Sequence, residues 1–175
     1  MMSLRQQAPE FDKTIAYQAG RDDFVRVSLA DYRKKWVVLF FYPRDFTFVC
    51  PTELKEFARL EEEFEKYHTA ILACSTDSEW SHKNWFERDL AMVKYPIVAD
   101  TTHDISRAYG VLAADGASER GTFIIDPEGN LRWFMVSDNA VGRSVKEVLR
   151  AVQALQTGER CPVEWEPGQN TLGKG

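Results

Sequence analysis

The pattern of hydrophobic and polar positions divides the chain into short buried strands and amphipathic helices. Residues 36–42 form a continuous apolar run, which is typical of a strand buried on both faces of a sheet. From Pro51 the apolar residues recur every three or four positions with Glu and Lys between them, which predicts a helix. The apolar positions of this helix are Leu54, Phe57, Leu60 and Phe64. We therefore expect a buried strand that leads directly into a helix.

The hydrophobic pattern also predicts strands and helices along the rest of the chain. The pattern predicts strands at 69–75 and 96–99, helices at 78–92, 104–109 and 144–155, and a hairpin from strands at 121–126 and 131–136. Residues 159–175 hold several Pro and Gly and have no periodicity, so we expect a tail there rather than a core element. This pattern predicts one domain over residues 1–158, followed by a tail that is not a separate domain.

The order of the predicted elements indicates the fold class. Strand, helix, strand, helix and strand are followed by a hairpin and a helix, which predicts an α/β protein. We expect a central mixed β-sheet flanked by helices on both faces, and a thioredoxin-like fold fits this order best. The first strand-to-helix turn would lie at the carboxyl end of a central strand, where sites in such sheets are usually found.

Composition and charge narrow the function classes. The chain has 175 residues, 44% of them hydrophobic and 28% charged, as in an ordinary globular protein. Its net charge is −5 and no basic block stands out, so nucleic acid is not an expected partner. The first residues lack the apolar core of a signal peptide, and the longest apolar run is too short to span a membrane. We expect a cytoplasmic protein with no metal or organic cofactor.

The three cysteines are Cys50, Cys74 and Cys161, and this sparse, odd number argues against a disulfide-stapled or zinc-bound scaffold. Cys74 lies within a predicted buried strand, so we expect an inert core thiol. Cys50 lies where the first strand meets its helix. A helix start offers free backbone N–H groups and the positive end of the helix dipole, which favour thiolate over thiol. The thiolate is the nucleophile, so this position predicts chemistry.

The neighbours of Cys50 support a reactive thiol. Pro51 suits the first helical turn, and Thr47 is placed so that its hydroxyl could lie beside the sulfur. The N–H groups of Val49 and Cys50 could hold a small polar substrate and stabilise negative charge. A cationic partner is still required, and the residues alone do not name it. Two other interpretations stay open at this point: a buried hydrophobic cysteine and a Cys–His hydrolase dyad.

The spacing Pro43-x-x-x-Thr47-x-x-Cys50 matches the active-site motif of the peroxiredoxins. The longer stretch from Phe41 to Glu53 resembles the typical 2-Cys subfamily, which includes the peroxidase component of bacterial alkyl hydroperoxide reductase. Further matches, in the same order as in the family, are Ser75-Thr76-Asp77, His82-Lys83-Asn84-Trp85, Arg120-Gly121-Thr122-Phe123-Ile124-Ile125-Asp126, Val141-Gly142-Arg143-Ser144 and Cys161-Pro162-Val163-Glu164-Trp165. The resemblance spans nearly the whole chain.

This resemblance implies an antioxidant thiol peroxidase with two active cysteines. Cys50 would attack the O–O bond of a peroxide and become a sulfenic acid. Cys161 would come from the partner subunit and capture that sulfenic acid as an intersubunit disulfide, since a sulfenic acid condenses readily with a thiol. Arg120 would be the missing cation that stabilises the thiolate and the peroxide.

The resemblance also implies roles for residues around the thiol. Thr47 would hydrogen-bond the thiolate and the substrate, and Pro43 would shield the site from water. Glu53 would orient the arginine. Val49 and Trp85 would support the substrate pocket.

The implied partners are hydrogen peroxide, alkyl hydroperoxides and a protein that reduces the disulfide. That reductant is either thioredoxin-like or a flavoprotein disulfide reductase. The resolving mechanism implies a homodimer, and family resemblance adds a decamer of five dimers. Two alternatives stay open: a holdase chaperone, and a 1-Cys enzyme that uses an external thiol.

Overall fold

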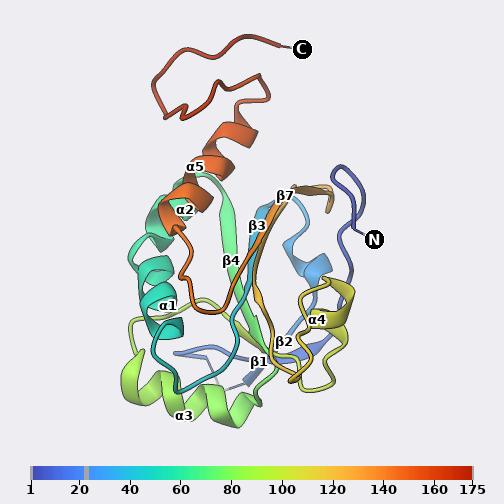
Figure 1. The fold of residues 1–175 in the computed structure, drawn as a ribbon, viewed down its shortest axis with the longest axis vertical. Coiled ribbons are helices and arrows are strands. Elements are labelled where there is room, and N and C mark those ends of the chain that lie inside the picture. The colour runs from blue at the N-terminus through green and yellow to red at the C-terminus, as the bar shows by residue number, and fades with distance from the viewer. Residues whose placement is uncertain (1, 22–23, 175) are drawn as a thin grey trace.

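The computed structural model describes residues 2–21 and 24–174, and within them the chain forms one seven-stranded sheet (Figure 1). The strands lie in the order β2-β1-β5-β4-β3-β6-β7. Their bounds are β1 Thr14–Tyr17, β2 Phe24–Val27, β3 Trp36–Phe41, β4 Thr69–Ser75, β5 Ile97–Ala99, β6 Arg120–Ile125 and β7 Leu131–Ser137. β3, β4 and β5 are parallel, and the strands on either side pair antiparallel, so the sheet is mixed as predicted.

Helices cover both faces of this sheet. The first face packs against α1 (Cys50–Arg59), α2 (Glu61–Lys66), α3 (Glu79–Asp89) and α5 (Val145–Gln156). The second face packs against α4 (Asp104–Ala108) and the short 3-10 helix η1 (Leu29–Tyr32). Side chains of β3 alternate between the two cores, as the period of a strand requires: Phe40 enters the first, and Leu39 and Phe41 the second. The predicted α/β, thioredoxin-like architecture is confirmed.

The predicted helix starts are also confirmed. Ser78 and Ser144 are the N-caps of α3 and α5, and their hydroxyls accept hydrogen bonds from the N–H groups of Ser81 and Glu147. The end of α3 was predicted too late, at residue 92. The helix ends at Asp89 because the next residue, Leu90, leaves helical geometry and turns its side chain fully into the core.

Two features differ from the sequence prediction. The helix expected through Phe64 is broken at Leu60, whose φ of −99° and ψ of 3° separate α1 from α2. The antiparallel pair β1 and β2 was not predicted, because two four-residue strands give too short a pattern. Their stability comes from tertiary pairing, in which β1 lies beside β5 with Ala16 opposite Val98.

The chain after α5 continues as a tail beyond the end of the helix (Figure 1). This tail contacts α5 in two places: Trp165 is buried and its carbonyl accepts a hydrogen bond from Arg150, and the Cys161 Sγ lies 3.7 Å from the Ala154 carbonyl. The division into a domain and a tail stays a prediction. Among the described residues, no helix is long and apolar enough to cross a membrane, and no cluster of His, Cys, Asp and Glu could hold a metal ion.

Candidate active site

The loop of residues 42–49 connects the end of β3 to Cys50, the first residue of α1. The side chain of Cys50 is buried, with 1% of its surface exposed. The first helical hydrogen bonds run from the N–H groups of Thr52 and Glu53 to the carbonyl of Val49. The N–H of Cys50 is one of the first donors of the helix, which have no acceptor within it. The structure thus places a buried thiol at a helix start and at the carboxyl end of a central strand.

Arg120, the first residue of β6, supplies the cation that faces this thiol. Its Nη1 lies 3.5 Å from the Cys50 Sγ. Its Nε and Nη2 donate to the carbonyl of Asn139 at 3.1 and 2.9 Å, which fixes the plane of the guanidinium. A guanidinium held at this distance stabilises a thiolate more than a neutral thiol.

Glu53 lies one helical turn after Cys50 and bridges two buried arginines. Its Oε2 accepts from Arg120 Nη1 at 2.7 Å, and its Oε1 accepts from Arg143 Nε at 2.9 Å. The backbone N–H of Arg143 also donates to Glu53 Oε1 at 2.8 Å. Two guanidinium groups and one carboxylate leave one positive charge beside the sulfur. In this position Glu53 can orient Arg120, which is the role that the resemblance implied.

Arg143 is the main residue that sequence reasoning missed. The sequence marked it only as part of a matching tetrapeptide and gave it no role. Besides Glu53, it donates to the Gly121 carbonyl and the Thr122 hydroxyl, both at 2.8 Å, and to the carbonyl of Phe41. Burial lowers the pKa of the Arg143 guanidinium, and Glu53 opposes that change. Arg143 therefore joins β3 and β6 to α1 at the site.

Pro43, Thr47 and Val49 all lie on the loop that precedes Cys50, and all three are half-buried. The Thr47 hydroxyl donates to the carbonyl of Arg44 at 2.9 Å. A hydroxyl has one proton, so this bond leaves none to donate to the Cys50 sulfur. The thiolate hydrogen bond expected of Thr47 would require its hydroxyl to rotate, and it stays a prediction, as do the roles of Pro43 and Val49.

A second buried network, made of hydrogen bonds, connects this loop to α3. The Asp45 carboxylate accepts from the Tyr42 hydroxyl and the Ser81 hydroxyl, each at 2.7 Å, and lies 2.8 Å from His82 Nδ1. Trp85, one turn after His82, is buried under the loop with its ring centroid 5.7 Å from that of Phe46. Trp85 of α3 thus packs against the loop that precedes Cys50. The sequence gave no role to Asp45 or His82, because their partners are distant along the chain.

The structure does not bring Cys161 to Cys50 within one chain. Cys161 lies beyond the carboxyl end of α5, where its Sγ is 3.6 Å from the Thr157 hydroxyl. Arg143, which contacts the Cys50 site through Glu53, lies just before the amino end of the same helix. The twelve residues of α5 span about 18 Å, so the two thiols lie at opposite ends of the helix.

Cys74 differs from the other two cysteines. It is fully buried in β4, and desolvation raises the pKa of its thiol well above the ordinary value. We expect the folded, reduced protein to leave Cys74 unmodified by a charged maleimide, while the half-exposed Cys161 reacts. Mass spectrometry of peptides labelled before and after unfolding in guanidinium measures this. Labelling of Cys74 in the folded protein at the rate of Cys161 would contradict the assignment of an inert core thiol.

A further prediction concerns Arg120. Replacing Arg120 by Met keeps a long side chain but removes the donors that face the Cys50 Sγ. Removal of one donor for a developing charge typically slows a reaction by about 10²- to 10³-fold. We expect the rate of Cys50 oxidation by peroxide, measured by stopped-flow fluorescence, to fall by about this factor. The matched control is Arg107→Met, on the exposed surface of α4, which should keep the original rate. If Cys50 were oxidised at the same rate in both variants, Arg120 would have no role in the reaction.

Comparisons with known proteins agree with this geometry. The AhpC/TSA family matches residues 4–134. A peroxiredoxin of Caenorhabditis elegans is 52% identical over 96% of this chain and 87% of its own length. A thioredoxin peroxidase of Trypanosoma brucei rhodesiense is 48% identical over 97% of this chain and 89% of its own. The crystal structure of reduced 2-Cys peroxiredoxin from Plasmodium vivax superposes with a TM-score of 0.92 at 35% identity, over 98% of this chain and 93% of that one.

The two relatives and the crystal structure cover nearly the whole chain, and the family match includes both Cys50 and Arg120. The chain therefore belongs to the AhpC/TSA family, among the 2-Cys peroxiredoxins.

Proposed function

We propose that this chain is a thiol-specific peroxidase that reduces hydrogen peroxide and organic hydroperoxides to water and alcohols. The observation that carries the proposal is the Cys50 Sγ at the start of α1, 3.5 Å from Arg120 Nη1. Peroxide reduction needs a nucleophile and a nearby positive group for the oxygen that leaves, and this site offers both. The names of the similar proteins support the same activity, which serves antioxidant defence.

In the first step, the Cys50 thiolate attacks one oxygen of the peroxide. The S–O bond forms as the O–O bond breaks, and the second oxygen leaves with the electron pair and takes a proton to become water or an alcohol. Arg120 and the free N–H groups of the helix start stabilise that departing negative charge. Thr47 orients the substrate, Pro43 limits the access of water, and Val49 supports the substrate pocket. Cys50 is left as a sulfenic acid.

In the second step, Cys161 resolves the sulfenic acid. Its thiolate attacks the Cys50 sulfur, the S–S bond forms as the S–O bond breaks, and the hydroxide that leaves takes up the proton that the Cys161 thiol lost and becomes water. Because α5 separates the two cysteines within one chain, Cys161 acts on Cys50 of the partner subunit. The tail that carries Cys161 holds few core contacts, so it can reach across a subunit boundary.

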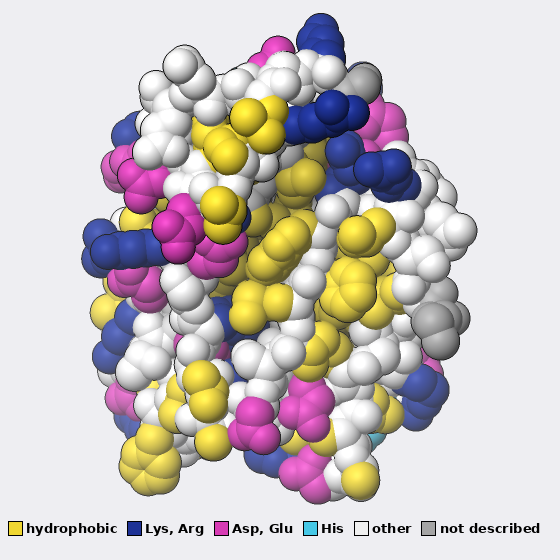
Figure 2. All heavy atoms as spheres, turned by 45° about the horizontal axis from the view of Figure 1, so that its top comes forward, with side chains coloured by type: hydrophobic (Ala, Val, Ile, Leu, Met, Phe, Trp, Pro, Cys, Tyr) yellow, Lys and Arg dark blue, Asp and Glu magenta, His cyan; other side chains and the backbone are white. Residues whose placement is uncertain are grey.

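The sheet edge at β7 supports the homodimer that this step requires. β7 is the last strand of the sheet. Leu131 at its start bonds to Arg5 and Gln6, but beyond it one row of backbone groups has no strand partner among the described residues. Two of its large hydrophobic side chains, Phe134 and Val136, are 42% and 49% exposed. Figure 2 shows hydrophobic side chains gathered at the centre of the face seen there. We propose that β7 pairs with β7 of a second copy, and that five such dimers can assemble into a decamer.

The resulting disulfide must be reduced by another thiol protein before the next cycle. The name of the Trypanosoma brucei rhodesiense relative favours thioredoxin as the electron donor. A flavoprotein disulfide reductase is the second candidate. A cytoplasmic location follows from the sequence and stays a prediction.

The proposal is tested by peroxide consumption with dithiothreitol as reductant. We expect the reduced protein to remove hydrogen peroxide and tert-butyl hydroperoxide in many turnovers. In the Cys161→Ser variant, one equivalent of peroxide should leave a sulfenic acid on Cys50 that dimedone traps, as mass spectrometry would show. A fully reduced protein that consumes neither peroxide would contradict the proposed function.

A further inference from the structure

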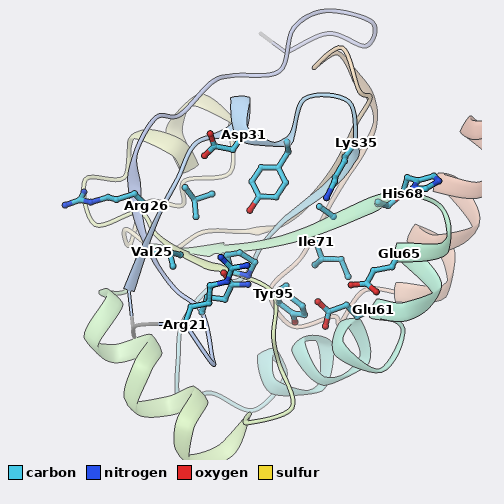
Figure 3. Close-up of a pocket in the computed structure, with 16 residues that line it drawn as sticks. Arg21, Val25, Arg26, Asp31, Lys35, Glu61, Glu65, His68, Ile71 and Tyr95 are labelled. Atoms are coloured by element: carbon cyan, nitrogen blue, oxygen red, sulfur yellow. The ribbon is translucent and has the colours of Figure 1, made fainter.

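A pocket of about 600 Å³ opens between α2 and the N-terminal strands, away from the peroxide site (Figure 3). Its walls come from the β1–β2 region, η1, α2, the start of β4 and the segment before β5. Neither Cys50 nor Arg120, Glu53 or Cys161 lines it. Its volume lies within the roughly 300–1,000 Å³ typical of small-ligand sites. The mechanism proposed above gives this pocket no role.

One wall of the pocket carries two carboxylates. Glu61 and Glu65 lie four positions apart on α2, so they share one face of the helix. Within the part of the chain that the structure describes, neither forms an ion pair. Burial raises the pKa of Glu61, the charge of Glu65 raises it further, and the Lys94 ammonium opposes both with a smaller effect. A cationic group bound at this wall would relieve the repulsion between the two carboxylates.

The opposite side of the pocket carries a basic group. Figure 3 shows Arg21 across from Glu61 and Glu65, with Tyr95 between them. Arg21 likewise has no ion-pair partner among residues 2–21 and 24–174. The pocket is therefore negative at the α2 wall and positive at Arg21. Further charged groups, Arg26, Asp31 and Lys35, line its other sides, and Val25, Ile71 and Tyr95 add apolar surface. A ligand that fits it would carry an ammonium group at one end and a carboxylate at the other.

The pocket also borders a stretch of β4 that has no partner strand on its β5 side. Pairing between β4 and β5 ends at Ala73 and Ile97, so Thr69–Leu72 of β4 pair only with β3. On the β5 side, the N–H of Asp100 donates to the Ser75 carbonyl at 2.9 Å. If the same hydrogen-bond pattern continued four residues toward the start of each strand, the N–H of residue 96 would donate to the Ile71 carbonyl. Residue 96 is Pro and has no N–H, so this carbonyl lacks its strand partner.

The N–H of Ile71 faces the same side. The Ala73 N–H donates to the Pro96 carbonyl at 3.0 Å, and the period of a strand directs the Ile71 N–H the same way. The carbonyl it would reach belongs to Lys94, which accepts a hydrogen bond from the Gln18 side chain at 3.0 Å. Ile71 thus presents a donor and an acceptor to the pocket, the pair that one peptide group of an added strand uses.

We propose that this pocket binds a short peptide with free termini in an extended conformation. The peptide's amine lies against Glu61 and Glu65, its carboxylate lies against Arg21, and one of its peptide groups pairs with the backbone of Ile71. Among the described residues, the two carboxylates and Arg21 have no ion-pair partner, and the Ile71 backbone has no partner strand on this side. The peptide would supply each of these partners.

The test is isothermal titration calorimetry of the full chain with trialanine, and with trialanine blocked at both ends by acetyl and amide groups. We expect free trialanine to bind and the blocked form to bind at least about tenfold more weakly. The Glu61→Gln/Glu65→Gln double variant and Arg21→Gln should each weaken trialanine binding by about tenfold or more. The control Glu62→Gln, exposed on the same helix but outside the pocket, should bind as the original chain does.

Three outcomes would overturn the proposal. The first is no binding of trialanine at millimolar concentration. The second is equal binding of the blocked peptide or of the double variant, which would exclude the charged walls. The third is free alanine binding as tightly as trialanine, which would exclude pairing with Ile71. Circular dichroism spectra should be the same for the two pocket variants, the control and the original chain, which shows that each is folded and makes the test independent of the proposed peroxidase activity.

Discussion

Replacing Cys50 by Ser is expected to reduce peroxide turnover to the level of buffer alone. A serine hydroxyl is a much weaker nucleophile than a thiolate, and only the sulfur of Cys50, 3.5 Å from Arg120 Nη1, can attack the O–O bond as one. Peroxide remaining in solution, measured over time with excess dithiothreitol, reports the loss. The substitution exchanges one buried atom, so we expect an unchanged circular dichroism spectrum.

The matched control is Cys74→Ala, which removes the inert thiol from β4 and should keep most of the activity. The same pair of variants separates the peroxidase from a holdase chaperone. A chaperone role should survive in Cys50→Ser, measured as protection of an unfolding client protein from aggregation, whereas turnover should not. Turnover by Cys50→Ser at the rate of the original chain would contradict the assignment of Cys50 as the nucleophile.

Replacing Glu53 by Gln is expected to destabilise the fold by about 3–5 kcal/mol, because it removes the shared partner of two buried guanidinium groups. The side chains of Arg143 and Arg120 are only 0% and 4% exposed, so water cannot replace the lost carboxylate. For a chain of this length, that loss lowers Tm by roughly 10 °C, measured by differential scanning calorimetry. The free energy lost is large because the arginines remain buried.

The control for this prediction is Glu56→Gln, one turn further along α1. Glu56 pairs with Arg59 on the exposed surface, where a broken ion pair changes stability little. A Tm for Glu53→Gln that equals the Tm of Glu56→Gln would show that the buried arginines do not depend on Glu53. A Glu53→Gln protein that is destabilised but keeps its rate of Cys50 oxidation would separate the structural role of Glu53 from the orientation of Arg120.

Much of the site could be predicted from the sequence because its central feature is local. The amphipathic pattern of α1 begins next to Cys50, after the apolar run of β3, so the thiol could be placed at a helix start from neighbouring residues alone. The loop of residues 42–49 between β3 and α1 was not predicted. The roles of Arg120 and Glu53 came from resemblance, since they lie 67 positions apart and no local pattern links them. The structure places Arg120 beside the sulfur and Glu53 against Arg120.

The residues that sequence reasoning missed act through tertiary contacts. Arg143 contacts Glu53 across 90 positions, and His82 contacts Asp45 across 37. Periodicity carries no information about such pairs. The prediction for Thr47 rested on its spacing from Cys50, but spacing does not determine the direction of a hydroxyl, which here donates to Arg44. The break at Leu60 was missed because the apolar period continues across it from α1 into α2.

The central claim is that Cys50 of one subunit forms a disulfide with Cys161 of its partner. It is tested most directly by adding one equivalent of hydrogen peroxide to the reduced protein and separating the products without reductant. We expect a covalent dimer that contains the peptide pair Cys50–Cys161 and is absent from both Cys50→Ser and Cys161→Ser. A sulfenic acid on Cys50 without a covalent dimer would show a 1-Cys enzyme, and a Cys50 left unoxidised would contradict the whole mechanism.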